Sequence, residues 1–438
     1  ETEGRGRVPL VRDRSHQPFQ QASSNHAFDK VATEIQRIKD SYSRDAFAIV
    51  STGQIMTEEF YTLGKLARGV IGTNNYDGNT TLCMSSAVSG YKRSFGSDGP
   101  PGCYEDFEHT DCLLAIGSNL PEQHPVIYWR MREAREKRKF PLIVIDPRVT
   151  MLAQNADMHL PISPGTDLVL LNSIAHVILQ EGLQDQAYID AHTEGYAAFK
   201  ELVEHYDPVS AAKICGIDED SIRNVARLYA KAPAGSILYC MGITQHTSGV
   251  DNVKSLANLA MLCGNMGIRG GGVNPLRGQN NVQGACDMGG LPNVYPGYQN
   301  VTVPAVKEKF EQAWGKELSD KIGLPATEMT EAMLEQIDLL GRVIGQIEHC
   351  PATLAVGRRG VPDDLPVALP NRALAIELPA NHVVVVIDFA GTGEFGHQRA
   401  APDRRNRLAA IAVTGMFGAG EFEESRQHIH RGTDDVVA

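Results

Sequence analysis

Cys83 is the residue of this sequence whose type and surroundings first suggest chemistry. It lies in a stretch of small and hydroxyl-bearing residues, 80–88, directly after a glycine- and asparagine-rich segment, 72–79. No second cysteine is near enough in sequence to form a two-cysteine metal motif. A lone cysteine in this setting is a candidate nucleophile or a single thiolate ligand of a metal, and a buried structural thiol is the alternative.

Arg277 is the second candidate. It is the only strong cation in residues 270–290, a segment otherwise dominated by glycine and amide side chains and without apolar periodicity. A solvated linker normally carries more charge and serine, so we expect a buried loop that makes many hydrogen bonds to a polar ligand. A guanidinium can bind a small anion through two parallel hydrogen bonds, and a structural salt bridge is the alternative role for Arg277.

Three predicted strands end in polar loops, at residues 117–119, 146–148 and 242–245. In open α/β sheets, ligands bind outside the carboxyl ends of the strands, and backbone N–H groups of such loops suit diphosphates. Asp146 and Asp167 are suited to accept hydrogen bonds from a ribose or a guanine edge. Each loop alone fits an ordinary turn, because Gly, Ser, Asn and Asp favour turns. Three loops at equivalent positions favour a nucleotide-type ligand.

The elements that must position these residues alternate between helix and strand. Apolar spacing predicts helices at 27–41, 124–139, 168–181 and, in two pieces, 208–231. Thr166 is the expected N-cap of the third helix. Short apolar runs predict strands at 46–50, 112–116, 142–145, 236–241 and 383–387. Continuous apolar strands between amphipathic helices are typical of a parallel, doubly wound sheet, so the expected fold class is α/β.

Composition limits the functions that this chain of 438 residues can have. The net charge of −12 argues against a nucleic acid or an anionic membrane as the main partner, and no apolar run approaches the length of a membrane span. The eight cysteines are dispersed without a CxxC pair, which excludes a zinc ribbon or a local iron–sulfur motif and favours a reducing compartment. We therefore expect a cytoplasmic protein, or a periplasmic one if an export signal was removed ahead of Glu1.

Taken together, these motifs resemble those of the molybdopterin oxidoreductases of the dimethyl-sulfoxide-reductase superfamily. The resemblance covers about residues 45–300. Its motifs are specific to this superfamily when they occur together. The motifs that carry it are Gly72-Thr73-Asn74-Asn75 leading to Cys83, Gly117-Ser118-Asn119 with His124-Pro125, Asp146-Pro147-Arg148, Pro164-Gly165-Thr166-Asp167, Met241-Gly242-Ile243-Thr244-Gln245 and Arg277-Gly278-Gln279-Asn280-Asn281.

The resemblance implies a multi-domain fold with mostly parallel sheets and two molybdopterin guanine dinucleotides (bis-MGD) around one Mo or W. Cys83 falls on the position of the protein's metal ligand, which suits a soft thiolate. The residues expected to bind the cofactor are Gly117, Ser118, Asn119, His124, Asp146, Arg148, Gly165, Asp167, Met241, Gly242, Gln245, Gly278 and Gln279.

The two ends of the motif set resemble different members of the family. Residues 274–289 are similar to formate dehydrogenases, in which the arginine at the position of Arg277 is thought to hold the formate carboxylate. Residues 82–92 are similar to assimilatory nitrate reductases, and Met84 stands where formate dehydrogenases usually have His. We expect formate oxidation, or its reverse, with Cys83, Met84 and Arg277 at the catalytic site. Nitrate reduction is the alternative, and a non-catalytic subunit that keeps the fold is a second one.

The resemblance also suggests how the chain is organised and what it works with. The family's [4Fe–4S] ligands are not recognisable in this sequence, so we expect electrons to pass to an iron–sulfur or flavin subunit, with a small anion as substrate. The expected segments are an N-terminal arm at 1–25, a first α/β segment with the metal-ligand cysteine at 26–120, a dinucleotide-binding α/β domain at 121–240, a second pterin- and substrate-binding segment at 241–345, and a divergent or truncated C-terminal region at 346–438.

Overall fold

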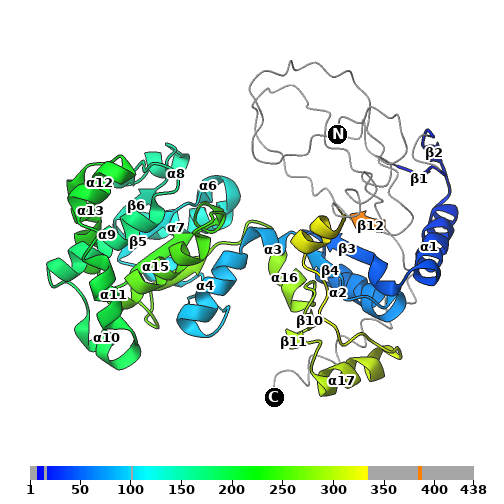
Figure 1. The fold of residues 1–438 in the computed structure, drawn as a ribbon. Coiled ribbons are helices and arrows are strands. Elements are labelled where there is room, and N and C mark those ends of the chain that lie inside the picture. Colours follow the sequence, from blue (N-terminus) through cyan, green and yellow to red (C-terminus); the bar gives the residue numbers. More distant parts are fainter. Residues whose placement is uncertain (1–6, 14–16, 100–101, 334–382, 387–438) are drawn as a thin grey trace, which may run out of the picture. The chain divides into compact units, whose positions relative to one another are not determined.

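The protein is described by a computed structural model that covers residues 7–13, 17–99, 102–333 and 383–386 (Figure 1). The chain forms two compact units. Unit 1 combines residues 1–79 with residues 281–438, and unit 2 comprises residues 80–280. None of the helices in the described ranges has both the length and the apolar character that a bilayer crossing requires.

Unit 2 is built on a five-stranded sheet in which every neighbouring pair of strands is parallel. Its strands are β5 (Cys112–Ile116), β6 (Leu142–Ile145), β7 (Met158–Leu160), β8 (Gly235–Tyr239) and β9 (Gly272–Pro275). Their spatial order is β7-β6-β5-β8-β9, so the chain builds outward from β5 on one side and then returns to add β8 and β9 on the other. This reversal makes a topological switch point between β5 and β8, where open α/β sheets bind their ligands.

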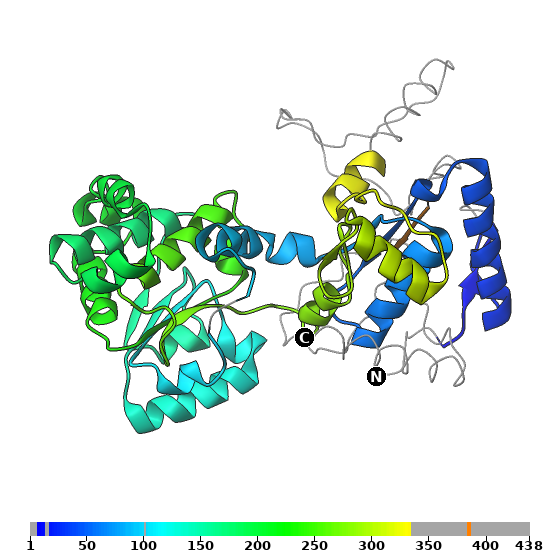
Figure 2. The same ribbon diagram turned by 90° about the horizontal axis from the view of Figure 1, so that it is seen from below.

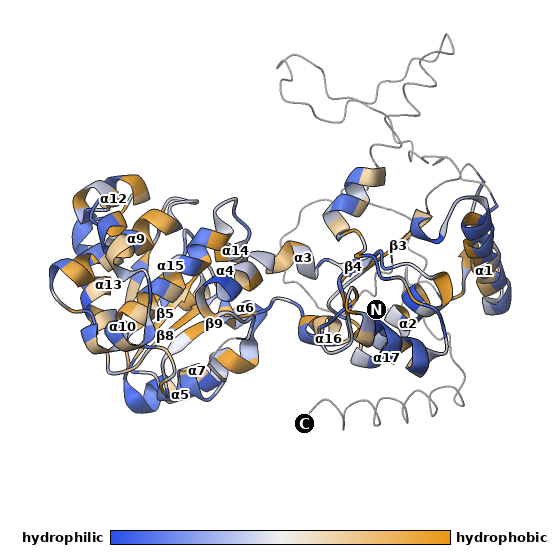
Figure 3. Cartoon of the chain, turned by 60° about the horizontal axis from the view of Figure 1, so that its bottom comes forward, coloured by the Kyte–Doolittle hydropathy of each residue, from blue (hydrophilic) through white to orange (hydrophobic). Residues whose placement is uncertain are grey.

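Both faces of the unit 2 sheet are buried. Successive side chains of β5 belong to different apolar clusters. Leu114 and Ile116 pack in the first cluster, on one face of the sheet, and Leu113 and Ala115 pack in the second cluster, on the other face. The first cluster includes α9 (Asp167–Gln180), α13 (Glu219–Ala230) and α15 (Gly249–Leu262), and the second includes α7 (Pro125–Arg138). Figure 2 shows α7 and these other helices on opposite sides of the strands, and Figure 3 shows the strands as strongly hydrophobic. The sheet is therefore the middle layer of three, as the continuous apolar runs predict.

The turn that carries Cys83 is held by a close contact between two helices. α3 (Thr80–Cys83) ends at this cysteine, and α4 (Ser85–Phe95) follows and packs on α15. A Cβ atom on Gly90 of α4 would lie 2.4 Å from Cγ1 of Val253, so only glycine fits there. The remaining helices of unit 2 are α5 (Asp106–His109), α6 (Leu120–Gln123), α8 (Met151–Gln154), α10 (Gln186–His192), α11 (Tyr196–Val203), α12 (Pro208–Cys215) and α14 (Met241–Thr244).

Unit 1 contains a three-stranded parallel sheet in the order β12-β3-β4. Its strands are β3 (Phe47–Ser51), β4 (Tyr76–Gly78) and β12 (Val383–Val386). Phe47, Ile49 and Tyr76 form its core with residues of the flanking helices. The other elements of this unit are β1 (Leu10–Val11), β2 (Gln20–Gln21), α1 (Ser24–Ser41), the 3-10 turn Arg44–Ala46, α2 (Thr57–Lys65), the π-helical turn Leu66–Ile71, α16 (Val282–Asp287), β10 (Val294–Tyr295), β11 (Gln299–Asn300) and α17 (Pro304–Trp314).

The α/β class and most predicted elements are confirmed. The strands at 112–116 and 142–145 have the predicted bounds, and the other predicted helices and strands lie within a few residues of their expected positions. Residues 10–11 and 20–21, inside the expected N-terminal arm, pair as a short antiparallel ladder. The five segment boundaries stay predictions. Residues 334–345 and nearly all of the expected C-terminal region lie outside the described residues.

Two local predictions were wrong, and a third holds only in part. The strand expected at 236–241 ends at Tyr239, because the chain turns into α14 at Met241. Thr166 occupies the N-cap position of α9 as predicted, but its hydroxyl donates to the Ser163 carbonyl oxygen at 2.7 Å and makes no capping hydrogen bond to the helix. The segment 270–290, expected to be an irregular loop, contains β9 and α16, because β9 pairs with β8 at the edge of the sheet.

Candidate functional site

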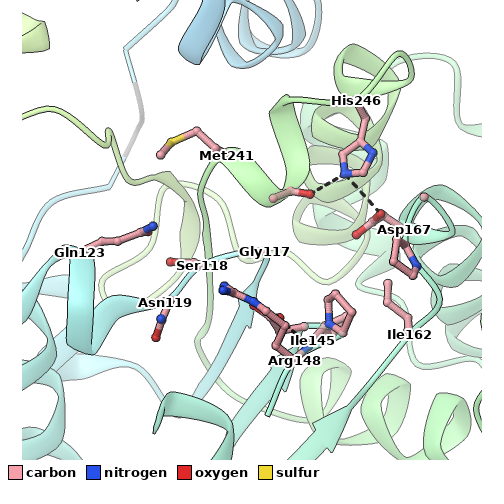
Figure 4. Close-up of a pocket in the computed structure, with 15 residues that line it drawn as sticks. Gly117, Ser118, Asn119, Gln123, Ile145, Arg148, Ile162, Asp167, Met241 and His246 are labelled. Atoms are coloured by element: carbon pink, nitrogen blue, oxygen red, sulfur yellow. Dashed lines mark hydrogen bonds and ion pairs between the residues drawn. The ribbon is translucent and has the colours of Figure 1, made fainter. Parts of the chain in front are cut away.

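A cavity of about 240 Å³ opens at the carboxyl edge of the unit 2 sheet, beside the switch point (Figure 4). Nine residues expected to bind the cofactor line it: Gly117, Ser118, Asn119, Asp146, Arg148, Gly165, Asp167, Met241 and Gly242. Six lining residues were not predicted: Gln123, Ile145, Pro147, Ile162, Pro164 and His246. Pro147 and Pro164 belong to motifs quoted above, and Gln123, Ile145 and His246 each directly adjoin one, so their place in the sequence was the available signal.

The floor of this pocket is a contact between two backbones. The amide of Gly242 donates to the carbonyl oxygen of Gly117 at 3.1 Å. Gly117 has a φ of +56°, and a Cβ atom there would lie 2.7 Å from the carbonyl carbon of Gly242. Only glycine can adopt this left-handed backbone without strain and also leave room for the close approach of Gly242. The loops after β5 and β8 therefore meet without intervening side chains, and both glycines line the cavity.

Replacing Gly117 by Ala is expected to destabilise unit 2 by about 3 kcal/mol, because left-handed strain and overpacking add. Gly182 is the matched control, since its φ is +66° and no atom lies within 4 Å of its would-be Cβ. Gly182→Ala should cost only about 1 kcal/mol. In a Trp314→Phe background, denaturation followed by the fluorescence of Trp129 in unit 2 measures both free energies of unfolding. Equal costs would rule out the backbone contact as the cause.

The pocket wall holds buried polar atoms that no group in the described part of the chain satisfies. Ser118 Oγ and Asn119 Oδ1 have no hydrogen-bond partner among the described residues, although both residues are at most 4% exposed. Buried polar atoms in folded proteins are nearly always paired, because leaving one unpaired costs about 1–3 kcal/mol. These two atoms, next to the glycine contact, fit a polar ligand such as a nucleotide diphosphate.

A carboxylate and an imidazole lie side by side in the pocket lining (Figure 4). Burial raises the pKa of Asp167, which begins α9, while the neighbouring His246 acts in the opposite direction. His246 Nε2 lies 2.8 Å from the carbonyl oxygen of Gly242 and 4.0 Å from Asp167 Oδ2 (Figure 4). Asp146 Oδ1 is occupied by the backbone N–H of Arg148 at 2.8 Å. Asp167 and Asp146 thus both place a carboxylate in the lining of the pocket.

Cys83 and Arg277 lie together in unit 2. Burial raises the pKa of the Cys83 thiol, while a hydrogen bond from the backbone N–H of Gly278 and the charge of Arg277 lower it. The guanidinium of Arg277 makes an ion pair with Asp98, whose Oδ1 lies 3.4 Å from Nη2. A half-buried thiol, a backbone donor and a cation therefore meet at one place, which suits a thiolate ligand beside an anion site.

The backbone of Arg277 and Gly278 is held from two sides. Nε2 of His124 lies 2.6 Å from the carbonyl oxygen of Arg277, and a Cβ atom on Gly278 would lie 2.6 Å from Cε of Met241. Met241 also lines the pocket, whereas His124 and Gly278 do not. Met241 thus contacts both the pocket and the loop beside Cys83.

Met84 points away from Cys83 into the core. It is 1% exposed and packs in the apolar cluster of α4 and α15. The hydroxyl of Thr244 lies 3.3 Å from Met84 Sδ and donates to the carbonyl oxygen of Cys83 at 3.0 Å. Gln245 Nε2 donates to the carbonyl oxygen of Leu82 at 3.4 Å, so α14 supports this turn at two points. Gln279 lies in the loop that follows Arg277.

The described part of the chain contains no group of three or more His, Cys, Asp or Glu side chains arranged to hold a metal ion.

Comparison with known proteins identifies the family. The sequence profile of the molybdopterin oxidoreductases matches residues 5–356. The chain is 44% identical over 331 residues to the F420-dependent formate dehydrogenase 1 subunit alpha of Methanococcus maripaludis, an alignment that covers 76% of this chain and 48% of that protein. It is 40% identical over 326 residues to a nitrate reductase of a Synechocystis strain, which covers 73% of this chain and 46% of the relative.

A solved structure has the same fold. Acetylene hydratase from Pelobacter acetylenicus matches with a TM-score of 0.53 and 26% identity, over 60% of this chain and 36% of that one. The chain spans about half the length of the curated relatives it matches. With its profile match over most of the sequence and relatives at 40–44% identity, the chain belongs to the molybdopterin oxidoreductase family.

Proposed function

We propose that this chain carries the metal and substrate site of a Mo- or W-dependent formate dehydrogenase, which oxidises formate to CO2 or catalyses the reverse. The observation that carries the proposal is the meeting of Cys83 with Arg277 and Gly278, which are almost two hundred residues away in sequence. The F420-dependent formate dehydrogenase relative at 44% identity supports this choice of substrate.

The cofactor proposed is bis-MGD with Mo or W, and the pocket of unit 2 is proposed to hold one of its dinucleotides. Ser118 and Asn119 fit the diphosphate or sugar, because their buried side-chain oxygens have no hydrogen-bond partner within the described ranges. Asp167 fits the guanine edge as a hydrogen-bond acceptor. When bound, the metal–pterin group supplies two-electron redox chemistry, which no side chain can provide.

The side chains around Cys83 have separate proposed roles. Cys83 supplies one thiolate to the metal, and the Gly278 N–H directs the sulfur. Arg277 binds the formate carboxylate through its guanidinium fork. Met84 and Thr244 hold the turn of Cys83 from the core side, so we assign Met84 a positioning role and no proton transfer. Electrons leave to an iron–sulfur or flavin subunit.

Nitrate reduction by oxygen-atom transfer is the second candidate function, with Cys83 still the ligand and nitrate on Arg277. Met84 and the nitrate reductase relative at 40% identity favour it. A subunit that keeps the fold without the metal is a third candidate. One Mo or W per chain by elemental analysis would exclude this metal-free subunit. A metal-replete protein that reduces nitrate but does not reduce dye with formate would make nitrate reduction the first candidate and formate oxidation the second.

Arg277→Ala is expected to raise the KM for formate about 10- to 100-fold, because a charge-assisted, two-pronged hydrogen bond to the substrate is lost. The measurement is formate-dependent dye reduction at equal metal content. Arg132→Ala removes an equal charge from an exposed position of α7 and should leave the KM unchanged. An unchanged KM in Arg277→Ala would remove the role assigned to this side chain.

A further inference from the structure

Asp98 is the acidic neighbour of Arg277, and the proposed reaction gives it no role. It lies after α4, and its single contact with the guanidinium is the 3.4 Å approach of Oδ1 to Nη2. Both side chains are 28% exposed. Burial raises the pKa of Asp98, while the charges of Arg277 and Lys92 oppose that shift. An acidic side chain is thus kept partly out of water beside the cation.

The surroundings leave Asp98 as the counter-charge of Arg277. The charged and titratable groups that interact with Asp98 are Arg277, Lys92 and the phenols of Tyr91 and Tyr239. Tyr91 donates its hydroxyl to the Val273 carbonyl oxygen, and burial raises the pKa of both phenols, so they stay neutral. The guanidinium therefore meets one fixed carboxylate among these groups.

The pair has the geometry of a replaceable contact. A tight guanidinium–carboxylate pair has two parallel hydrogen bonds at about 2.7–2.9 Å, whereas Arg277 and Asp98 have one long contact. His124 holds the backbone oxygen of Arg277, so the base of the side chain is fixed independently of Asp98. Formate, nitrate and azide are monoanions, as the Asp98 carboxylate is, and compete for the same charge.

We propose that Asp98 is an internal counter-anion of Arg277 that weakens the affinity of this guanidinium for small monoanions. A substrate anion must then displace the Asp98 carboxylate from Arg277 in order to bind. This inference rests on the proposed binding of the substrate anion by Arg277. Asp98 acts through Arg277 and is a positioning residue that sets the anion affinity of the site. It keeps the cation neutralised between turnovers and favours release of a bound anion.

The test is Asp98→Asn, which removes the charge and keeps the shape. The dissociation constant of formate, from line broadening of the ¹³C-formate NMR signal with the whole chain, should fall about 3- to 10-fold, since a partly buried opposite charge has been removed from the cation. In the holoenzyme, the KM for formate and the inhibition constant of azide should fall together while kcat changes less. Asp98→Glu should restore the affinity of the native chain.

Two controls separate charge from fold. Asp251→Asn makes the same change of net charge at an exposed position of α15 and should leave anion binding unchanged. In an Arg277→Ala background, Asp98→Asn should have no effect, since the two residues act as one unit. Weaker anion binding in Asp98→Asn overturns the proposal, because Asp98 would then orient Arg277 for substrate. Tighter azide binding in a protein that does not oxidise formate would support the counter-anion and reject only the proposed reaction.

Discussion

Replacing Cys83 by Ser is expected to lower formate-dependent turnover at least about 1000-fold at equal metal content, a loss of about 4 kcal/mol of transition-state stabilisation. Serine keeps the size of the side chain but offers a neutral, hard hydroxyl where a soft metal takes a thiolate. The Gly278 N–H and the charge of Arg277, which favour the thiolate at this position, would then face a group that stays protonated. The loss should appear in kcat, because Arg277 still binds the anion.

The matched control is Cys103→Ser, which changes an exposed free thiol of the same unit and should leave turnover unchanged. Thermal unfolding of Cys83→Ser should differ little from that of the native chain, because the sulfur is only half-buried. If Cys83 were a structural thiol, the result would be the opposite: lower stability with turnover per metal preserved. The pair of measurements therefore decides between the two readings of a lone cysteine.

Arg68→Met should destabilise unit 1 by about 3 kcal/mol. Arg68 is 1% exposed, and its Nη2 donates to the carbonyl oxygens of Leu291 at 2.7 Å and Val294 at 2.9 Å. Burial lowers its pKa to about 10, and its guanidinium carbon lies 5.3 Å from the ring centre of Tyr76. Methionine fills the space but leaves both carbonyls buried without donors, at about 1–3 kcal/mol each. Relief of the desolvated charge offsets only part of that cost.

The stability of unit 1 can be read separately from that of unit 2. The sequence contains two tryptophans, Trp129 in unit 2 and Trp314 in unit 1. In a Trp129→Phe background, denaturant unfolding followed by fluorescence reports on Trp314 alone. Arg37→Met, an exposed arginine of α1, is the control and should change the free energy of unfolding by less than about 0.5 kcal/mol. Equal effects of the two substitutions would contradict a structural role for the buried guanidinium.

Much of unit 2 could be predicted because its signals are local. β5 and β6 have the predicted bounds, since four or five consecutive apolar residues between helices read as strands buried on both faces. The carboxyl ends of parallel strands share one edge, so the loops after β5, β6 and β8 had to meet, and nine predicted residues line one cavity. Short elements were less predictable. The apolar run of β8 continues to Met241, but the chain changes direction there and begins α14, which no local pattern indicates.

The sequence by itself determined the α/β class and the alternation of elements, and it marked the polar loops and single residues predicted to bind a cofactor. Only the tertiary structure decided which of these residues meet. Asp98 pairs with Arg277 across 179 positions, and His246 turns toward Asp167, although no local pattern marks either pair. Met84, adjacent to Cys83, is directed into the core by the packing of α4 on α15. The physical reason is that periodicity records how a segment buries its own apolar face, whereas contacts between distant polar side chains depend on the path of the whole chain.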